Sequence, residues 1–440
     1  MTGKTKLAAA LMLATALSGC GIFKTSKPKA TLLGDRIAVL TSENSAELDA
    51  SIADVPVTVP AAEANEGWTQ PGGNAQKSMG NLALGANLTR AWTVSIAGSS
   101  KQVRLAAAPV VQGTRVYVMD TEAMIRAIDI ATGAVAWSTQ LADPKGNKAS
   151  LFGGGVSVDG PRAYATNGVG DAAALDIATG KILWQKRPGG PLRGAPTVSN
   201  GNVYVVSQDN QLFALNADTG ATVWNESGTL EAAGVFGVAA PAAAQGTVVA
   251  GFSSGELTAY RYENGRAVWQ DALSRTSIST AVSTLSDIDA DPVIDGGRVY
   301  AVGQGGRMVA LELTTGQRLW ELNIAGISTP WVAGDWLYVV TDDARLLCIQ
   351  RATGRIRWIS QLPRWRNEKS KKGRIGWTGP VLAGDRLLVA STEGQILPVT
   401  PADGKQGTAL EAGKEIYLSP VVANKMLFVL DNDGKLSGWR

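Results

Sequence analysis

The sequence predicts an all-β protein, an eight-bladed β-propeller of four-stranded blades that is closed by an N-terminal strand. Three observations predict this fold: a repeated turn of the form Gly-x-x-x-Trp, a repeated pair of short apolar strands, and an unusual composition. The 440 residues include 51 Gly and 13 Trp but only 6 Phe. Many short strands joined by tight turns, with one recurrent aromatic residue, give this profile.

Residues 1–19 are expected to be a lipoprotein signal peptide. Two lysines precede an apolar stretch, residues 7–17, that is too short to cross a bilayer. The stretch runs into Leu-Ser-Gly-Cys, which resembles the bacterial lipobox and implies that Cys20 is acylated and becomes the mature N-terminus. Gly21 stands where an inner-membrane lipoprotein would show Asp, so the resemblance favours the outer membrane. An ordinary signal peptide with an incidental cysteine is the alternative.

Residues 20–65 are expected to be a flexible, lipid-anchored tether, and residues 66–440 the propeller. The tether region shows no repeat and is rich in Ala, Ser, Thr and Glu. About 45 residues of flexible chain average roughly 35 to 40 Å from end to end, so the ring can stand off a membrane. No later segment is long and apolar enough for a transmembrane helix, which leaves the acyl chains as the expected membrane contact.

The Gly-x-x-x-Trp repeat predicts the outer half of each blade. Its first copy spans Ala127 to Trp137, with Gly133 in a turn where glycine can take positive φ. Successive tryptophans are 38 to 51 positions apart, which matches one four-stranded blade. Each indole is expected to fill the wedge between neighbouring blades. The tryptophans given this structural role are Trp92, Trp137, Trp184, Trp224, Trp269, Trp320 and Trp358. A degenerate copy keeps Gly404 but has Thr408 at the tryptophan position.

A second pattern, an apolar strand, a short turn and another strand, predicts the inner half of each blade. It occurs eight times, first at Pro109 to Val118, and seven copies begin with proline. The chain stops at Arg440 after the third strand of the eighth blade. Trp92 precedes the first inner strand at the right interval, so its strand is expected to complete the last blade. Such a closure removes two exposed sheet edges.

Common catalytic and binding motifs are missing from the sequence. It contains no histidine, the commonest general base and metal ligand, and no P-loop or dinucleotide-binding motif. Cys348, the only cysteine besides Cys20, is expected to be a small buried hydrophobe rather than a disulfide partner. A net charge of +3 gives no case for nucleic acid. We therefore expect no enzyme activity, no cofactor and no metal.

Two charged segments leave alternatives open. Residues 286–291 hold three aspartates, which are candidates for a calcium or catalytic site, a partner contact or a solvated loop. Residues 364–374 carry six positive charges against one negative. A solvated loop between blades is one interpretation of the basic segment. The other is a contact with an acidic protein surface or with anionic head groups, flanked by Trp365 and Trp377.

The Ala-x-Asp-x-x-Thr-Gly-x-x-x-Trp repeat resembles the unit of pyrroloquinoline-quinone-like propellers. One branch of that group, the quinoprotein dehydrogenases, holds a quinone and calcium at the ring axis, usually beside a disulfide between adjacent cysteines. This sequence lacks adjacent cysteines and is shorter than those enzymes. The other branch, the BamB family of outer-membrane protein assembly factors, shares the lipobox, the eight blades and the length. The resemblance to BamB covers the chain from Trp68 onward.

Two loops strengthen the resemblance to BamB. Residues 190–197 resemble its Leu-Arg-Gly loop, and residues 285–289 resemble its Leu-Ser-Asp-x-Asp loop. In the family these loops face the POTRA domains of the barrel subunit BamA, which implies partner-binding roles for Leu192, Arg193, Asp287 and Asp289. Gly190 stands where the family can carry a further apolar contact.

The resemblance implies a non-enzymatic scaffold lipoprotein of the outer-membrane β-barrel assembly (BAM) complex. Such a protein would be anchored in the outer membrane through Cys20, would face the periplasm and would bind BamA and other BAM subunits. It would aid the folding and insertion of outer-membrane proteins, and direct binding of unfolded clients stays open. A periplasmic quinoprotein-like ligand-binding propeller or dehydrogenase is the main alternative function. A structural sensor or cell-wall-associated interaction module of the same fold is a third possibility.

Overall fold

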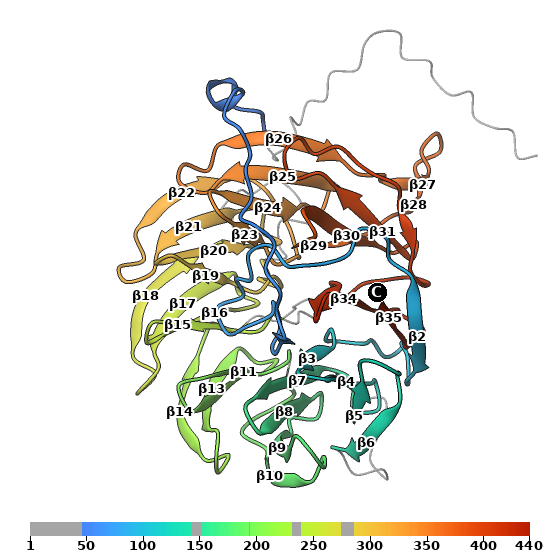
Figure 1. The fold of residues 1–440 in the computed structure, drawn as a ribbon. Helices are drawn as coiled ribbons and strands as arrows, with labels where there is room; N and C mark the ends of the chain where they lie inside the picture. Colours follow the sequence, from blue (N-terminus) through green and yellow to red (C-terminus); the bar gives the residue numbers. More distant parts are fainter. Residues whose placement is uncertain (1–45, 142–150, 193, 231–238, 274–285) are drawn as a thin grey trace, which may run out of the picture. The chain divides into compact units, whose positions relative to one another are not determined.

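The computed structural model describes residues 46–141, 151–192, 194–230, 239–273 and 286–440. In these residues the regular structure is almost entirely β-strand, arranged as eight antiparallel blades around an axis (Figure 1). Each blade starts with a strand near the axis and ends with a strand at the rim. None of the described helices is long and apolar enough to cross a membrane. The fold predicted from the repeats is therefore confirmed.

The first four blades follow one another along the chain. Blades 1 and 2 comprise β3 (Val110–Gln112), β4 (Arg115–Met119), β5 (Met124–Asp129), β6 (Val135–Gln140), β7 (Gly154–Asp159), β8 (Arg162–Asn167), β9 (Ala172–Asp176) and β10 (Ile182–Lys186). Blades 3 and 4 comprise β11 (Thr197–Ser199), β12 (Asn202–Val206), β13 (Gln211–Asn216), β14 (Thr222–Ser227), β15 (Ala242–Ala244), β16 (Thr247–Gly251), β17 (Glu256–Arg261) and β18 (Ala267–Ala272).

The last four blades include the closing strand. Blades 5 and 6 comprise β19 (Val293–Asp295), β20 (Arg298–Val302), β21 (Met308–Glu312), β22 (Arg318–Leu322), β23 (Trp331–Ala333), β24 (Trp336–Val340), β25 (Arg345–Gln350) and β26 (Ile356–Gln361). Blades 7 and 8 comprise β29 (Trp377–Ala383), β30 (Arg386–Ser391), β31 (Gln395–Val399), β32 (Leu410–Glu411), β33 (Val421–Ala423), β34 (Met426–Leu430), β35 (Lys435–Trp439) and β2 (Arg90–Ser95). A hairpin of β27 (Trp365–Asn367) and β28 (Lys372–Arg374) lies between blades 6 and 7.

The ring closes as predicted, by pairing the N-terminal strand β2 with β35. Trp92 lies opposite Gly438 in this antiparallel pair, which Figure 1 shows beside the C-terminus. Thr89 and Arg440 exchange two backbone hydrogen bonds of 2.7 and 2.9 Å. Blade 8 is therefore held together by segments from both ends of the propeller.

The repeat tryptophans join neighbouring blades, as predicted. Each indole Nε1 donates a hydrogen bond of 2.7 to 3.1 Å to a carbonyl of the next blade. Each ring also lies against the repeat glycine of that blade. These glycines have φ of +70° to +75°, and a Cβ there would lie 2.5 to 3.0 Å from the indole. Glycine is thus required both by the turn and by the close approach of the ring.

Residues 65–82, named here the hub segment, contact the inner strands of all eight blades. Figure 1 shows this blue segment crossing the middle of the ring. Within it, β1 (Gly67–Trp68) adds a fifth strand to blade 1 by pairing with β3. The remaining contacts, taken in chain order through blades 8, 2, 3, 4, 5, 6 and 7, are Asn65 to Val422, Thr69 to Val158, Gln70 to Val198, Ala75 to Ala243, Gln76 to Ile294, Gly80 to Trp331 and Leu82 to Leu382, with donor–acceptor distances of 2.8 to 3.1 Å.

Residues 46–65, which the sequence analysis placed in the tether, make specific contacts with the propeller. They include the short helix η2 (Ala50–Ile52), whose Ile52 is buried. The backbone N–H of Asp49 donates to the Ile356 carbonyl at 3.0 Å, and Arg357 Nε donates to the Val55 carbonyl at 2.9 Å. Residues 20–45 of the expected tether, including Cys20, lie outside the described residues.

Candidate partner-binding site

Blade topology places the loops of the propeller on two opposite faces. In each antiparallel blade the turns between strands 1 and 2 and between strands 3 and 4 lie at one end, which we name the turn face. The segments that link one blade to the next lie at the other end, the linker face. Both predicted partner loops, around Leu192 and around Asp287, link successive blades. They therefore lie on the linker face, around the axis.

Leu192 is only 1% exposed. Its side chain belongs to the apolar cluster between blades 2 and 3, together with Trp184 and Phe213. Its backbone forms a bridge with Ser207, and the neighbouring Pro191 carbonyl accepts a 2.7 Å hydrogen bond from Gln208. In this structure Leu192 therefore fixes the loop from inside the fold. Arg193, the predicted charged contact beside it, lies outside the described residues.

The two predicted aspartates differ in exposure. Asp287 is 1% exposed, and its backbone carbonyl accepts a 2.9 Å hydrogen bond from the backbone N–H of Gln304. Asp289 is partly exposed, and its carboxylate accepts a 2.7 Å hydrogen bond from the Gln304 side chain. The same glutamine thus holds both residues of the loop. Of the predicted site residues that the structure describes, Asp289 is the one whose side chain reaches the surface at the axis.

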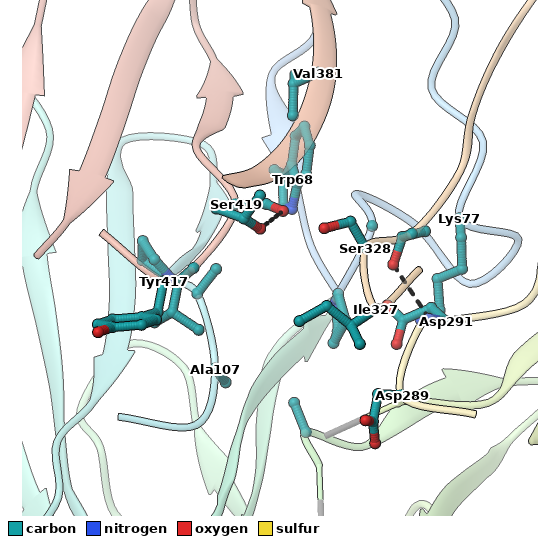
Figure 2. Close-up of a pocket in the computed structure, with 18 of the residues that line it drawn as sticks. Trp68, Lys77, Ala107, Asp289, Asp291, Ile327, Ser328, Val381, Tyr417 and Ser419 are labelled. Atoms are coloured by element: carbon teal, nitrogen blue, oxygen red, sulfur yellow. Dashed lines mark hydrogen bonds between the residues drawn. The ribbon is translucent and has the colours of Figure 1, made fainter. Parts of the chain in front are cut away.

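A pocket of about 150 Å³ lies on the axis and connects the two predicted loops. Ala195 lines it from one loop, and Asp289 and Asp291 line it from the other. Trp68 of the hub segment also contributes to its wall (Figure 2). Among the described residues, no three acidic or cysteine side chains converge as metal ligands would.

Ile327 and Tyr417 line the same pocket but were missed by the sequence analysis. They are 54% and 51% exposed, whereas the other large apolar side chains that line the pocket are buried or partly buried. Both are the third residue before the proline that starts an inner strand, and Arg193 and Asp289 occupy the same repeat position. We name this the mouth position. The residue before it is buried in three blades, as Leu192, Ile288 and Ile416.

Lys77 of the hub segment is buried beneath the pocket. Its side chain is 1% exposed and its ammonium donates a 3.1 Å hydrogen bond to the Thr197 hydroxyl. Figure 2 shows it extending toward Asp291. Burial lowers the pKa of Lys77 to about 8, and the Asp291 charge opposes that shift. Burial also raises the pKa of Asp291. A buried amine and a buried carboxyl therefore share the base of the pocket.

The depressed pKa of Lys77 predicts a pH-dependent contribution to stability. Between pH 8 and 10.5 the unfolded chain holds a proton on this amine that the folded chain has lost, so rising pH favours folding. From pH 7.5 to 10, the wild type should gain about 2 kcal/mol of unfolding free energy relative to Lys77→Met. Urea unfolding at both pH values measures this gain.

Two controls isolate the effect of Lys77. Buried tyrosines act in the opposite direction, because burial raises their pKa values, to about 12 at Tyr204 and Tyr260. The Lys77→Met variant keeps these tyrosines, so their effect cancels when its unfolding free energy is subtracted from that of the wild type. The control variant Lys405→Met changes an exposed lysine and keeps Lys77, so it should gain as much as the wild type. Equal behaviour of the two variants would contradict the prediction.

The remaining sequence expectations fall elsewhere in the fold. Residues 365–374 form the β27–β28 hairpin, whose Arg366 makes an exposed ion pair with Glu393. Cys348 is fully buried on β25, and burial raises the pKa of its thiol, so the expected buried hydrophobe is confirmed.

Comparison with known proteins identifies relatives over most of the propeller. The sequence model of the family described as "Outer membrane protein assembly factor BamB" matches residues 74–152, 148–360 and 363–439. The protein of that name from Yersinia pestis is 29% identical over 351 residues, covering 79% of this chain and 87% of its own length. The one from Vibrio cholerae is 37% identical over 251 residues, covering 57% and 64%.

Solved structures share the fold at lower identity. The crystal structure of BamB from Moraxella catarrhalis matches with a TM-score of 0.67 and 21% identity, covering 80% of this chain and 100% of that one. A europium-containing methanol dehydrogenase matches with a TM-score of 0.65 and 15% identity, covering 85% and 89%. At such identities the likeness shows the fold alone, and that fold is common to assembly factors and dehydrogenases.

Proposed function

The chain belongs to the family of the outer membrane protein assembly factor BamB, and we propose that it is a non-enzymatic scaffold of the β-barrel assembly complex. The observation that carries this proposal is the family match, which spans nearly the whole propeller from residue 74 to 439. The relatives with sequence similarity over most of their length are assembly factors. The dehydrogenases resemble the chain in fold only, so the dehydrogenase alternative is not favoured.

We propose further that the linker face binds the POTRA domains of BamA. The mouth positions supply an apolar centre, Ile327 and Tyr417, beside the carboxylate of Asp289. Arg193 occupies the same repeat position and adds a positive charge. Interfaces of this kind combine aromatic and apolar anchors with charges that set orientation. Leu192 and Asp287 would act by holding their loops in place, because both are buried.

Binding of the full-length chain to purified POTRA domains of the same organism's barrel subunit tests this interface. Ile327→Asp places a charge at the apolar centre, and Asp289→Lys reverses the charge beside it. Each variant should weaken binding at least tenfold, which corresponds to about 1.4 kcal/mol. Isothermal titration calorimetry gives the affinities.

Two matched controls separate the interface from general surface effects. Leu319→Asp changes a 40%-exposed apolar residue at the rim, and Asp403→Lys reverses an exposed charge in the turn of the degenerate repeat copy, on the turn face. Both should bind like the wild type. If the interface variants and the controls retain equal affinity, the linker face is not the binding surface. Leu192→Ala is unsuitable as the primary test, because truncating a buried leucine destabilises the fold itself by about 2 to 5 kcal/mol.

We propose that the mature chain is held at the outer membrane by acyl chains on Cys20 and faces the periplasm. Support comes from the lipobox-like Leu-Ser-Gly-Cys and from the family membership of the propeller. More than one acyl chain gives a stable anchor, whereas a single chain binds only marginally. Affinity purification of the chain from envelopes, followed by intact mass measurement, would detect acylated Cys20. The co-purification of BamA from the same sample would support membership of the complex.

A further inference from the structure

Blade 7 departs from six of the other seven blades at three aligned positions. In most blades an aromatic residue on strand 2, a small residue on strand 3 and the repeat tryptophan on strand 4 form one cross-strand row, as in Tyr117, Ala127 and Trp137. The two rings of such a row lie 5.9 to 6.3 Å apart in six blades. The row of blade 7 instead holds Leu388 opposite Pro398, and Thr408 stands at the tryptophan position.

The substitutions in blade 7 leave a surface cavity of about 270 Å³. Leu388, Pro398 and Thr408 line it, together with Leu410 of β32 and Leu88 from the arm that leads into β2. The rim strand β32 pairs with β31 over only two residues, so it covers little of this space. An apolar cavity of about 150 Å³ is already large enough for benzene, and this one has room for an indole.

The neighbouring blade explains why blade 7 carries no tryptophan of its own. At the seven other junctions the indole packs on the repeat glycine of the next blade. In blade 8 that turn is replaced by two chain segments, Thr89 and Arg440, which exchange hydrogen bonds with each other. No glycine turn is present there to receive an indole from inside the ring. The cavity is thus a tryptophan site without its internal occupant, and we name it the vacant tryptophan site.

We propose that the vacant tryptophan site binds a tryptophan side chain of a partner protein. The other seven blades of the propeller support this proposal, because an indole fills the equivalent position in each of them. The walls are mostly apolar, which favours a large hydrophobic side chain. Arg386 also lines the cavity, where its guanidinium is fixed by hydrogen bonds of 2.9 and 2.6 Å to the carbonyls of Ala86 and Gly85. A fixed guanidinium favours an aromatic ring over an aliphatic chain.

The first test uses 5-fluoroindole as a probe of the full chain, observed by fluorine NMR. The wild type should bind it saturably at one site. Thr408→Trp fills the site from within, and Leu88→Phe fills it from the arm, so each should weaken binding at least tenfold. Thr222→Trp adds a tryptophan at an exposed position on β14 and should leave binding unchanged. The Leu88→Phe variant and a thermal unfolding curve keep the test valid if Thr408→Trp folds poorly.

The second test asks whether the site accepts a tryptophan within a peptide. The hexapeptide Thr-Val-Trp-Asn-Glu-Ser, the sequence of the rim strand β14, should displace 5-fluoroindole. The same peptide with alanine in place of tryptophan should be at least tenfold weaker. Absence of saturable indole binding to the wild type would overturn the proposal. So would unchanged binding in both filled variants, or equal displacement by the two peptides. Because the site lies at the rim, these outcomes are independent of the POTRA interface on the linker face.

Discussion

Replacing Trp184 by alanine is expected to lower the free energy of unfolding by about 3 to 5 kcal/mol. The side chain is 8% exposed, donates a 3.0 Å hydrogen bond to the Ala217 carbonyl of blade 3, and packs on Gly220. Alanine removes the buried ring, leaves a cavity between two blades and removes the indole donor to that carbonyl, which keeps a longer, 3.5 Å hydrogen bond from Arg162. Urea unfolding followed by circular dichroism measures the loss.

The adjacent residue provides a matched control for this result. Leu183 lies on the same strand but is 49% exposed, so Leu183→Ala should change stability by no more than about 0.5 kcal/mol. The partner glycine gives a second check. Gly220→Ala is strained by φ of +70° and would bring a Cβ within 2.5 Å of the Trp184 ring. Its cost should fall when Trp184 is already alanine, and simple additivity of the two changes would contradict the packing described above.

Replacing Trp68 by alanine should cost a similar 3 to 5 kcal/mol, although Trp68 belongs to no repeat. It is 3% exposed, stacks on Trp331 with ring centroids 5.9 Å apart, and lies in the strand that the hub segment adds to blade 1. Loss of the ring removes an apolar link between blades 1 and 6, which are not neighbours in the ring. Denaturant unfolding, compared with the wild type, gives the difference.

Trp365 serves as the control for Trp68. It lies on the β27–β28 hairpin and is only partly buried, so its truncation should cost about 1 kcal/mol or less. If Trp68→Ala proves as mild as Trp365→Ala, the hub segment contributes little to the stability of the ring. A large loss confined to Trp68 would show that the segment is an integral part of the fold.

The blades could be predicted because each carries the same local signals. The glycine turn, the tryptophan and the proline-led strand pair recur at a spacing that fits one blade, and the pairing of Trp92 with the last blade follows from counting strands. Even the defect at Thr408 was visible in the sequence. Its physical reason was not, because it depends on what the neighbouring blade presents across the junction.

The partner-binding site was harder to predict. The family resemblance identified two loops but not which of their side chains are exposed. The resemblance assigned partner binding to Leu192 and Asp287, which are buried in the fold. It assigned no role to Ile327 and Tyr417, which are exposed. The alignment of repeats on their prolines would have found the exposed residues, since all of them share one position. The hub segment could not be anticipated at all. It carries no period, and most of its partners are main-chain groups from distant blades that no sequence pattern identifies.

The order of contacts along the hub segment has a consequence for how such rings can change in evolution. The segment meets blades 8, 1, 2, 3, 4, 5, 6 and 7 in that sequence, and eighteen residues suffice for one full circuit. If a gene duplication inserted a ninth blade, or a deletion left seven, each hub residue beyond the point of change would face a different blade from the one it now contacts. The length of the hub segment therefore matches the number of blades. The number of blades can change only if the length of the hub segment changes too.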